Sequence, residues 1–219
     1  DTILGFVTGI HVSTSKNLKI GDWIGIPKYN IEGNIQDINL LTTKIVNFDK
    51  TISTIPTYDL LSTEIRNHQV MYEGSSRRIK RSIYFNIKSF KFVDDEFYEK
   101  VKDINLISEY LDRKLREIAE SKKNIPHAER IINGQQLTNI GLFRNYVLNY
   151  LKNNPKVDQD EIVLVRQLEI SPQGMPLEIY CFANKAELVD YERIQADIFD
   201  HILTAAQEFD LEIMQVAKA

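Results

Sequence analysis

Few residues in this chain have the types and spacing that catalysis or metal binding requires. The four histidines lie far apart, and none has another histidine, a cysteine or a close carboxylate at metal-ligand spacing; they are His11, His68, His127 and His201. The single cysteine, Cys181, lies in an apolar run and is predicted to belong to the core. The sequence also lacks a nucleophile elbow, a phosphate-binding loop and a dinucleotide-binding glycine pattern. We therefore expect no enzyme activity, no metal site and no cofactor.

The densest positive cluster lies in the stretch SSRRIKRS, over residues 75–82. It comprises Arg77, Arg78, Lys80 and Arg81. One interpretation is a contact with phosphate, from either nucleic acid or an anionic lipid headgroup. The alternative is a solvated linker that pairs with acidic residues downstream. The linker is favoured because the cluster is short and has no aromatic residues between its cations.

The composition is that of a folded, soluble protein with one or two domains. The chain has 219 residues, of which 43% are hydrophobic, and this is enough to build a sizeable core. A net charge of -4 argues against a surface that binds nucleic acid throughout. One cysteine excludes an intrachain disulfide framework, and no window reaches the ~20 apolar residues that a membrane-spanning helix needs.

The first residues, DTILGFVTGIHVST, form an apolar stretch with helical spacing. Gly5 and Gly9 are four residues apart, so they lie on one side of such a helix, where a neighbour could approach closely. Three interpretations stay open: a terminal helix that docks on its own domain, an amphipathic segment at a membrane surface, or the end of a longer segment. One helical face carries large apolar residues, namely Ile3, Phe6, Val7 and Ile10.

Residues 17–76 are predicted to form a small β domain. From Leu18 the sequence breaks into short β-rich runs separated by turn residues, and Pro27 and Pro56 mark strand ends or sheet edges. Residues 35–46 resemble one long, bent strand, and residues 52–60 supply the next. Four or five short strands in about fifty residues indicate a barrel of Sm-like or SH3-like size.

Residues 77–219 are predicted to form a ferredoxin-like α/β domain. A strand precedes a helical segment that begins at an N-cap, Asp94, and divides into two helices near Asn105; Thr138 is a candidate cap for the next helix. Two strands joined by a turn at residues 171–174 follow, then a long amphipathic helix and a last strand over residues 211–216. This is a βαββαβ order with a helical insertion at about residues 105–157. The whole chain is therefore predicted to be α+β.

The order of elements and several short runs resemble a known family. The runs are ILGFVTGIHVS, IGDWIGIPKY, TIPTY, SSRRIKRSI, NGQQLTNIGLFRNYV, VRQLE and PLEIYCF, the last followed by YERIQADIFDHIL. Together they are similar to the cytoplasmic part of small-conductance mechanosensitive channels. The insertion and the run NGQQLTNIGLFRNYV resemble the miniconductance branch of that family.

The resemblance implies a tension-gated ion channel that releases ions and small osmolytes under osmotic stress. In that family, seven subunits surround a pore made by the last transmembrane helix, whose second half runs along the membrane surface against the β domain. Residues 1–16 correspond to that second half, which implies that the pore-lining half precedes residue 1. The β domains form a ring, and the ferredoxin-like domains form a cage with side portals on the cytoplasmic side of the cell inner (plasma) membrane.

The resemblance also implies roles for particular residues. Gly5 and Gly9 would allow close packing on a neighbouring subunit or at the helix kink, while the apolar face of residues 3–10 would pack on the membrane surface or on another subunit. The basic cluster would lie between ring and cage, at a portal or a subunit contact. The implied partners are other copies of the chain as a homo-oligomer, the lipid bilayer, and permeating ions and small solutes, with no nucleic acid.

Two other functions stay open from the residues alone. An Sm-sized barrel followed by RRIKR is also compatible with a nucleic-acid-binding module, whose affinity would fall steeply with salt. Ferredoxin-like folds host many functions, so a regulatory module that binds a small ligand is a further alternative.

Overall fold

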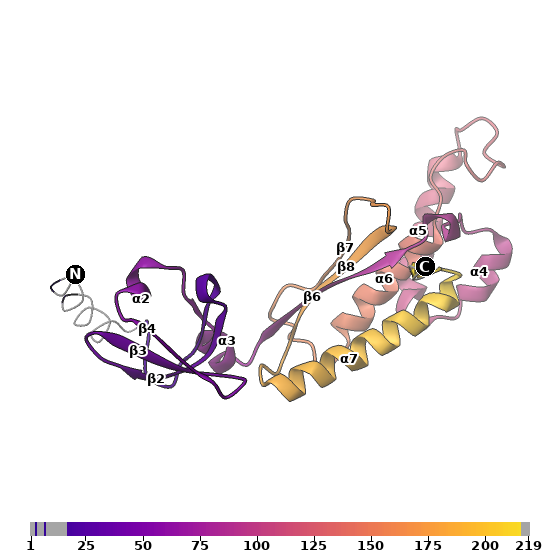
Figure 1. The fold of residues 1–219 in the computed structure, drawn as a ribbon. Helices are drawn as coiled ribbons and strands as arrows, with labels where there is room; N and C mark the ends of the chain where they lie inside the picture. The colour runs from indigo at the N-terminus through magenta and orange to yellow at the C-terminus, as the bar shows by residue number, and fades with distance from the viewer. Residues whose placement is uncertain (1–2, 4–6, 8–16, 216–219) are drawn as a thin grey trace. The chain divides into compact units, whose positions relative to one another are not determined.

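The computed structural model describes residues 3, 7 and 17–215 and divides the chain into two compact units, Asp1–Ser75 and Ser76–Ala219 (Figure 1). Each unit has a hydrophobic core of its own. The first core consists of isoleucines and one leucine between residues 24 and 60, and the second consists of residues between 79 and 211. The two cores share no residue.

The first unit is built on a five-stranded antiparallel sheet in the order β4-β3-β2-β1-β5. Successive side chains of a strand point to opposite faces, so alternate residues such as Ile31, Ile35 and Ile45 enter the core. The strands are β1 (Trp23–Ile26), β2 (Ile31–Ile38), β3 (Thr42–Asn47), β4 (Ile52–Pro56) and β5 (Arg66–Asn67). The short helices are η1 (Pro27–Tyr29), α2 (Asp59–Ser62) and α3 (Gln69–Glu73).

Residues 35–46, predicted as one long strand, are two strands joined by a turn, so that prediction was wrong. The Asn39 side chain makes the turn, because its Oδ1 accepts hydrogen bonds from the backbone N–H groups of Leu41 and Thr42, at 3.0 and 2.8 Å. Fully buried Thr57 supports the same turn by donating from Oγ1 to the Asn39 carbonyl oxygen at 2.7 Å. Apolar residues continue on both sides of Asn39, but the asparagine interrupts the extended backbone.

The small barrel predicted for residues 17–76 is, in the described part of the chain, a bent sheet with edges at β4 and β5. Two local features of β2 distort the sheet. A β-bulge shifts the register of β2 between Ile35 and Asp37. Gly33 lets β2 and β3 approach closely, since a Cβ at this position would lie 2.1 Å from the Val46 carbonyl oxygen.

The second unit has a three-stranded antiparallel sheet in the order β6-β8-β7, with α7 packed against β6 and β8 and α6 against β7 (Figure 1). The strands are β6 (Arg77–Phe85), β7 (Leu164–Gln167) and β8 (Met175–Ala183). The helices are α4 (Asp95–Val101), α5 (Asn105–Lys122), α6 (Asn139–Lys152) and α7 (Leu188–Ala205), with short turns of helix at η2 (Ile87–Ser89) and η3 (Ala206–Phe209). Among the described residues, none of these helices is long and apolar enough to cross a bilayer.

The predicted helix boundaries in this unit are confirmed by their caps. The Asp94 side chain accepts a hydrogen bond from the Phe97 N–H at 2.8 Å, and Thr138 Oγ1 accepts one from the Gly141 N–H at 3.1 Å. Both caps satisfy donors that the first turn of a helix leaves without an intrahelical partner. The break predicted near Asn105 is also confirmed, because α4 ends before this residue and α5 begins at it.

The last strand, predicted over residues 211–216, is a single bridge within the described residues. Ile213 pairs with Phe85 at the outer edge of β6, and the Met214 N–H donates to the Tyr84 carbonyl oxygen at 2.8 Å. The strand starts late because Leu211 is still hydrogen-bonded to η3, through the Ala206 carbonyl oxygen at 3.2 Å. The spatial order β7, β8, β6, bridge is that of the predicted split βαβ arrangement with a shortened fourth strand.

Candidate functional site

The predicted basic cluster lies in a strand rather than in a linker. Its four cations occupy the first half of β6, which pairs along its whole length with β8. Ile79 stands between the cations, is fully buried and pairs with Cys181 of β8. The linker interpretation is therefore wrong, because pairing with a strand distant in the sequence and one buried isoleucine outweigh the local charge.

Two cations of the cluster face the helix layer. The guanidinium carbon of Arg77 lies 4.3 Å from the centre of the Tyr191 ring, and that of Arg81 lies 4.0 Å from the centre of the Phe199 ring. Arg77 also donates from Nη1 to the Ala186 carbonyl oxygen at 3.3 Å. Both rings belong to α7, so these cation–π contacts hold the helix on the sheet.

The other two cations, Arg78 and Lys80, lie on the opposite face of β6, because side chains alternate along a strand. The guanidinium carbon of Arg78 lies 5.8 Å from the centre of the Tyr180 ring, and Lys80 is paired with Tyr180 across the strands. The Tyr180 and Phe182 rings meet edge to face, with their centres 5.8 Å apart. This side of the sheet therefore combines cations with aromatic rings.

We call this side of the three-stranded sheet the open face, because the core residues of the strands and the helices α6 and α7 lie on the other side (Figure 1). Antiparallel sheets commonly leave one face to solvent. By strand alternation and register, the open face carries Arg78, Lys80, Ser82 and Tyr84 of β6, Pro176, Glu178, Tyr180 and Phe182 of β8, and Leu164 and Arg166 of β7.

An ion pair with one buried partner, Glu178, lies on the open face. Arg166 donates to Glu178 Oε1 from Nε at 2.9 Å and from Nη2 at 2.8 Å. The Glu178 side chain is only 6% exposed, whereas the Arg166 side chain is 48% exposed. A carboxylate this deeply buried needs a charged, hydrogen-bonding partner, and Arg166 supplies it.

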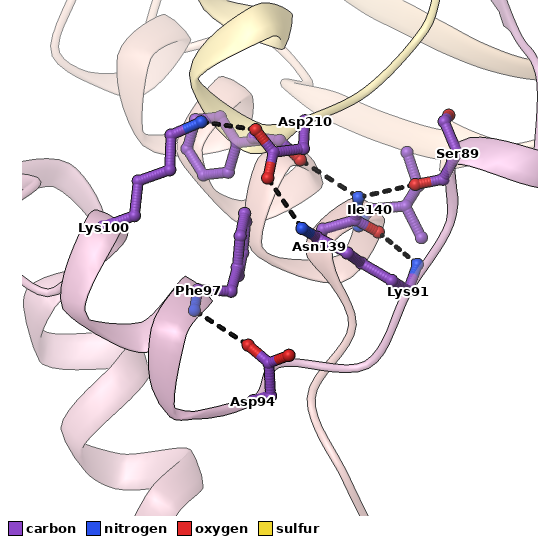
Figure 2. A network of polar contacts seen from close by, with 9 residues as sticks. Ser89, Lys91, Asp94, Phe97, Lys100, Asn139, Ile140 and Asp210 are labelled. Atoms are coloured by element: carbon purple, nitrogen blue, oxygen red, sulfur yellow. Dashed lines mark hydrogen bonds and ion pairs between the residues drawn. The ribbon is translucent and has the colours of Figure 1, made fainter.

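A second polar network ties together three segments of the α/β unit around buried Asn139 (Figure 2). The Asn139 Oδ1 accepts hydrogen bonds from the backbone N–H groups of Lys91 and Ile140, each at 2.9 Å. Its Nδ2 donates to the carbonyl oxygens of Ser89 at 2.9 Å and Phe209 at 3.0 Å. Since every partner is backbone, Asn139 acts as a structural connector and offers nothing to a ligand.

Asp210 extends this network to the surface (Figure 2). Its carboxylate accepts from Lys91 Nζ at 2.7 Å and also pairs with Lys100 Nζ. These charge-assisted hydrogen bonds, the one from Lys100 first, lower the pKa of Asp210 below its usual value. The pair of lysines thus attaches the chain after η3 to α4 and to the segment before it.

The remaining titratable groups build structure rather than a reactive centre. Burial raises the pKa of the Cys181 thiol to about 12, so the thiolate does not form near neutral pH and the predicted core role is confirmed. His201 of α7 stacks on Tyr150 of α6 with ring centres 4.2 Å apart, and its Nε2 lies 2.6 Å from the hydroxyl of Tyr146. In the part of the chain that the structure describes, no three His, Cys, Asp or Glu side chains are grouped to hold a metal ion.

Only part of the predicted N-terminal site lies among the described residues. Ile3 and Val7 are helical and exposed, at 82% and 58%. The other predicted positions, Gly5, Phe6, Gly9 and Ile10, lie outside the described residues.

Comparison with known families gives two matches in the order of the two units. The model of the mechanosensitive ion channel β-domain matches residues 1–70, and that of the mechanosensitive ion channel MscS C-terminal region matches residues 109–213. The chain belongs to the small-conductance mechanosensitive channel family. Members of this family are ion channels and not enzymes, which supports the non-enzymatic role expected from the residues.

Curated members of the channel family are longer than this chain. The low-conductance mechanosensitive channel YnaI of Escherichia coli (strain K12) is 24% identical over 207 residues, which cover 94% of this chain and 46% of YnaI. The small-conductance mechanosensitive channel MscMJ of Methanocaldococcus jannaschii is 36% identical over 67 residues, 31% of this chain and 19% of MscMJ. The chain therefore spans less than half the length of these relatives.

Solved channel structures share the fold of this family member. Arabidopsis thaliana MSL1 matches with a TM-score of 0.63 and 15% identity, covering 99% of this chain and 60% of MSL1. Helicobacter pylori MscS in its closed state matches with a TM-score of 0.58 and 15% identity, covering 100% of this chain and 65% of that protein. At this identity the likeness concerns the fold alone.

Sequence reasoning found two of the ten open-face residues of this channel-family chain and missed the other eight. It singled out Arg78 and Lys80 through their charge, but not Arg166, Glu178 or Tyr180. The signal was present in PLEIYCF, where polar or aromatic residues alternate with apolar ones at period two. That alternation predicts a strand with one buried and one exposed face, and it would have placed Glu178 and Tyr180 on the same side.

Proposed function

We propose that this chain forms the cytoplasmic vestibule of a tension-gated ion channel that releases ions and small osmolytes under osmotic stress. The observation that carries the proposal is the pair of family matches, which follow one another along the chain over residues 1–70 and 109–213. The similarity to YnaI, which covers 94% of this chain, supports a role in the same kind of channel. The run around Asn139 supports placement in the miniconductance branch.

We assign the segments of the vestibule by position. Residues 1–16 are the second half of the last transmembrane helix, with Gly5 and Gly9 at close packing positions. Residues 17–76 form the β domain, and residues 77–219 form the ferredoxin-like domain with its insertion at about 105–157. The exposure of Ile3 and Val7 supports an external partner for the apolar face of the first segment, such as the bilayer or another subunit.

The proposed channel is a homo-oligomer of seven copies in the cell inner (plasma) membrane, with this portion on the cytoplasmic side. Its other partners are the lipid bilayer and the permeating ions and solutes. Of the basic cluster, Arg78 and Lys80 are the two candidates for a portal or a subunit contact, since Arg77 and Arg81 are engaged with aromatic rings of α7.

The experiment is a patch-clamp measurement on the full-length protein that contains this chain. The protein is produced in cells without other tension-gated channels, and suction is applied to membrane patches. We expect channel openings whose probability rises with tension, together with improved cell survival after a sudden drop in osmolarity. Patches from cells with the empty vector are the control. Silence of the full-length protein at tensions that approach membrane rupture would refute the proposal.

A further inference from the structure

We infer that Asn133 and Gly134 form a site of spontaneous covalent modification, at which the asparagine is converted to aspartate and isoaspartate. The site lies in the long loop between α5 and α6, at residues 123–137, which belong to no helix or strand. The inference goes beyond the proposed function and does not rest on it, because the reaction needs only water and the chain itself.

The sequence marks this position among all the asparagines of the chain. Asn133 is the only asparagine that is followed by glycine. The reaction begins when the backbone nitrogen of the following residue attacks the side-chain carbonyl carbon of the asparagine. Glycine has no Cβ and reaches the widest range of backbone angles, so it obstructs this attack least.

The structure leaves the attacking nitrogen free to react. In the part of the chain that the structure describes, no group accepts a hydrogen bond from the Gly134 N–H. Gly134 is also exposed, so water reaches it. An amide inside a helix or a sheet is held by its hydrogen bond, whereas a loop amide without one moves more easily toward the neighbouring side chain.

The Asn133 side chain is held less firmly than a core amide. It is half-buried, and its Nδ2 donates to the His127 carbonyl oxygen at 2.8 Å. Asn139 of α6 has the opposite environment, because it is fully buried and both ends of its amide are bonded to backbone groups. The next residue after Asn139 is a β-branched isoleucine, which is stiff and obstructs the attack. We therefore expect Asn133 to react and Asn139 to stay intact.

The reaction balances without an oxidant, a reductant or a cofactor. The Gly134 nitrogen loses its proton to water and forms a bond to Cγ of Asn133. The bond from Cγ to Nδ2 breaks, and the leaving nitrogen takes up a proton and departs as ammonia, which leaves a cyclic succinimide. Water then opens the ring. Cleavage between the Gly134 nitrogen and Cγ gives aspartate, and cleavage between that nitrogen and the backbone carbonyl carbon gives isoaspartate.

The modification would loosen the loop from the end of α5. A carboxylate has no N–H to donate to the His127 carbonyl oxygen, and its negative charge would face that oxygen. In isoaspartate the main chain also runs through Cβ and Cγ, which displaces Gly134. There is little room for such a shift, since even a Cβ on Gly134 would lie 2.9 Å from Ile125 Cδ1 and 3.2 Å from Lys122 Cγ.

The first test is peptide mapping of the full-length protein after incubation at mildly alkaline pH. Asn124 is the internal control, because it is exposed in the same loop but is followed by Ile125. Trypsin cleaves after Lys123 and Arg130, so Asn124 and Asn133 appear in different peptides, and fragmentation identifies the modified residue. We expect aspartate and isoaspartate at Asn133 and no detectable change at Asn124 over the same time. An unmodified Asn133, or equal modification of both residues, would overturn the inference.

The second test compares hydrogen–deuterium exchange in fresh and incubated protein. The N–H groups of Ile125, Arg130 and Asn133 are hydrogen-bonded within the loop, and the modified protein should lose this protection. Fresh Asn133→Asp protein should show the same loss. Incubated Asn133→Gln protein is the control and should keep its protection, because glutamine retains the amide and closes a ring far more slowly. Protection that survives isoaspartate formation would refute the effect on the loop. Neither readout involves channel currents, so a full-length protein that never conducts would remove the proposed function and leave this site in place.

Discussion

Asn139 shows how one buried amide can connect segments that are far apart in the sequence. Replacement by alanine removes the partners of the Lys91 N–H and of the Ser89 and Phe209 carbonyl oxygens. Because a buried polar group without a partner costs about 1–3 kcal/mol, we expect Asn139→Ala to lower the free energy of unfolding by about 2–4 kcal/mol. Urea unfolding measures this change.

The control for Asn139 lies on the same helix. Asn145 is half-buried, and its Nδ2 donates to the Gly141 carbonyl oxygen of its own helix at 2.9 Å. Asn145→Ala is expected to change the free energy of unfolding by no more than about 0.5 kcal/mol, because alanine also favours the helix. Equal losses for the two variants would contradict the role assigned to Asn139.

The lowered pKa of Asp210 makes the stability of the folded protein depend on pH. Its pKa in the folded protein is lower than the usual value of 3.8, so the ionised carboxylate stabilises the fold above that pH, and the stabilisation disappears as the pH falls through the folded pKa. Asp210→Asn removes the charge, and asparagine tolerates the left-handed backbone at φ 55°. Since the Asp210 side chain is 37% exposed, we expect a loss below about 1 kcal/mol at pH 7.

The measurement is urea unfolding of both proteins at pH 7, 5 and 3. The difference in free energy of unfolding between the wild type and Asp210→Asn should be the same at pH 7 and at pH 5. It should shrink towards zero at pH 3. Glu161→Gln, at an exposed position, is the control and should leave the pH profile unchanged. A difference that stays constant down to pH 3 would show that the variant acts through something other than the two lysines.

At the scale of the element, adjacent cations of β6 have different surroundings because they lie on opposite faces of the strand. Arg81 lies over the Phe199 ring of α7, whereas Lys80 belongs to the open face. Arg81→Ala is expected to lower the free energy of unfolding by about 0.5–1 kcal/mol, and Lys80→Ala by less than about 0.5 kcal/mol. In a Phe199→Leu background, the cost of Arg81→Ala should fall to that of Lys80→Ala, as a double-mutant cycle would measure. An undiminished cost in that background would rule out the cation–π contact as its cause.

The elements that the sequence predicted well are those whose boundaries are set by hydrogen bonds between neighbouring residues. The caps at Asp94 and Thr138 each use a side chain to satisfy the first turn of their own helix, so a few neighbouring residues determine them. The strand over the basic cluster could not be predicted in this way. Its stability comes from β8 and from the burial of Ile79, and neither is visible in a run of four cations within five residues.

The predictions for residues 35–46 and for the last strand were wrong for a similar reason. Apolar residues recur closely on both sides of Asn39, so the sequence alone predicts one bent strand, while a side-chain hydrogen bond ends it. Leu211 belongs to an apolar run, yet its N–H bonds back to η3. Hydrophobic periodicity indicates which face is buried, whereas such hydrogen bonds decide where an element begins and ends.

At the scale of the whole molecule, the two separate cores predict two separately cooperative units. Ile45 is fully buried in the first core, and no residue of that core takes part in the second. Ile45→Ala leaves a cavity that is expected to cost the first unit about 2–5 kcal/mol. Because the cores are distinct, amide exchange should accelerate across residues 23–67 and stay unchanged across residues 77–211.

Hydrogen–deuterium exchange followed by mass spectrometry measures both regions in one experiment. Ile179→Ala in the second core is the reciprocal variant, and it should accelerate exchange in β6, β8 and α7 while β1–β4 keep their protection. Loss of protection in both units from either variant would mean that they unfold as one. Separate unfolding suits the proposed vestibule, because either unit could then lose its structure without melting the other.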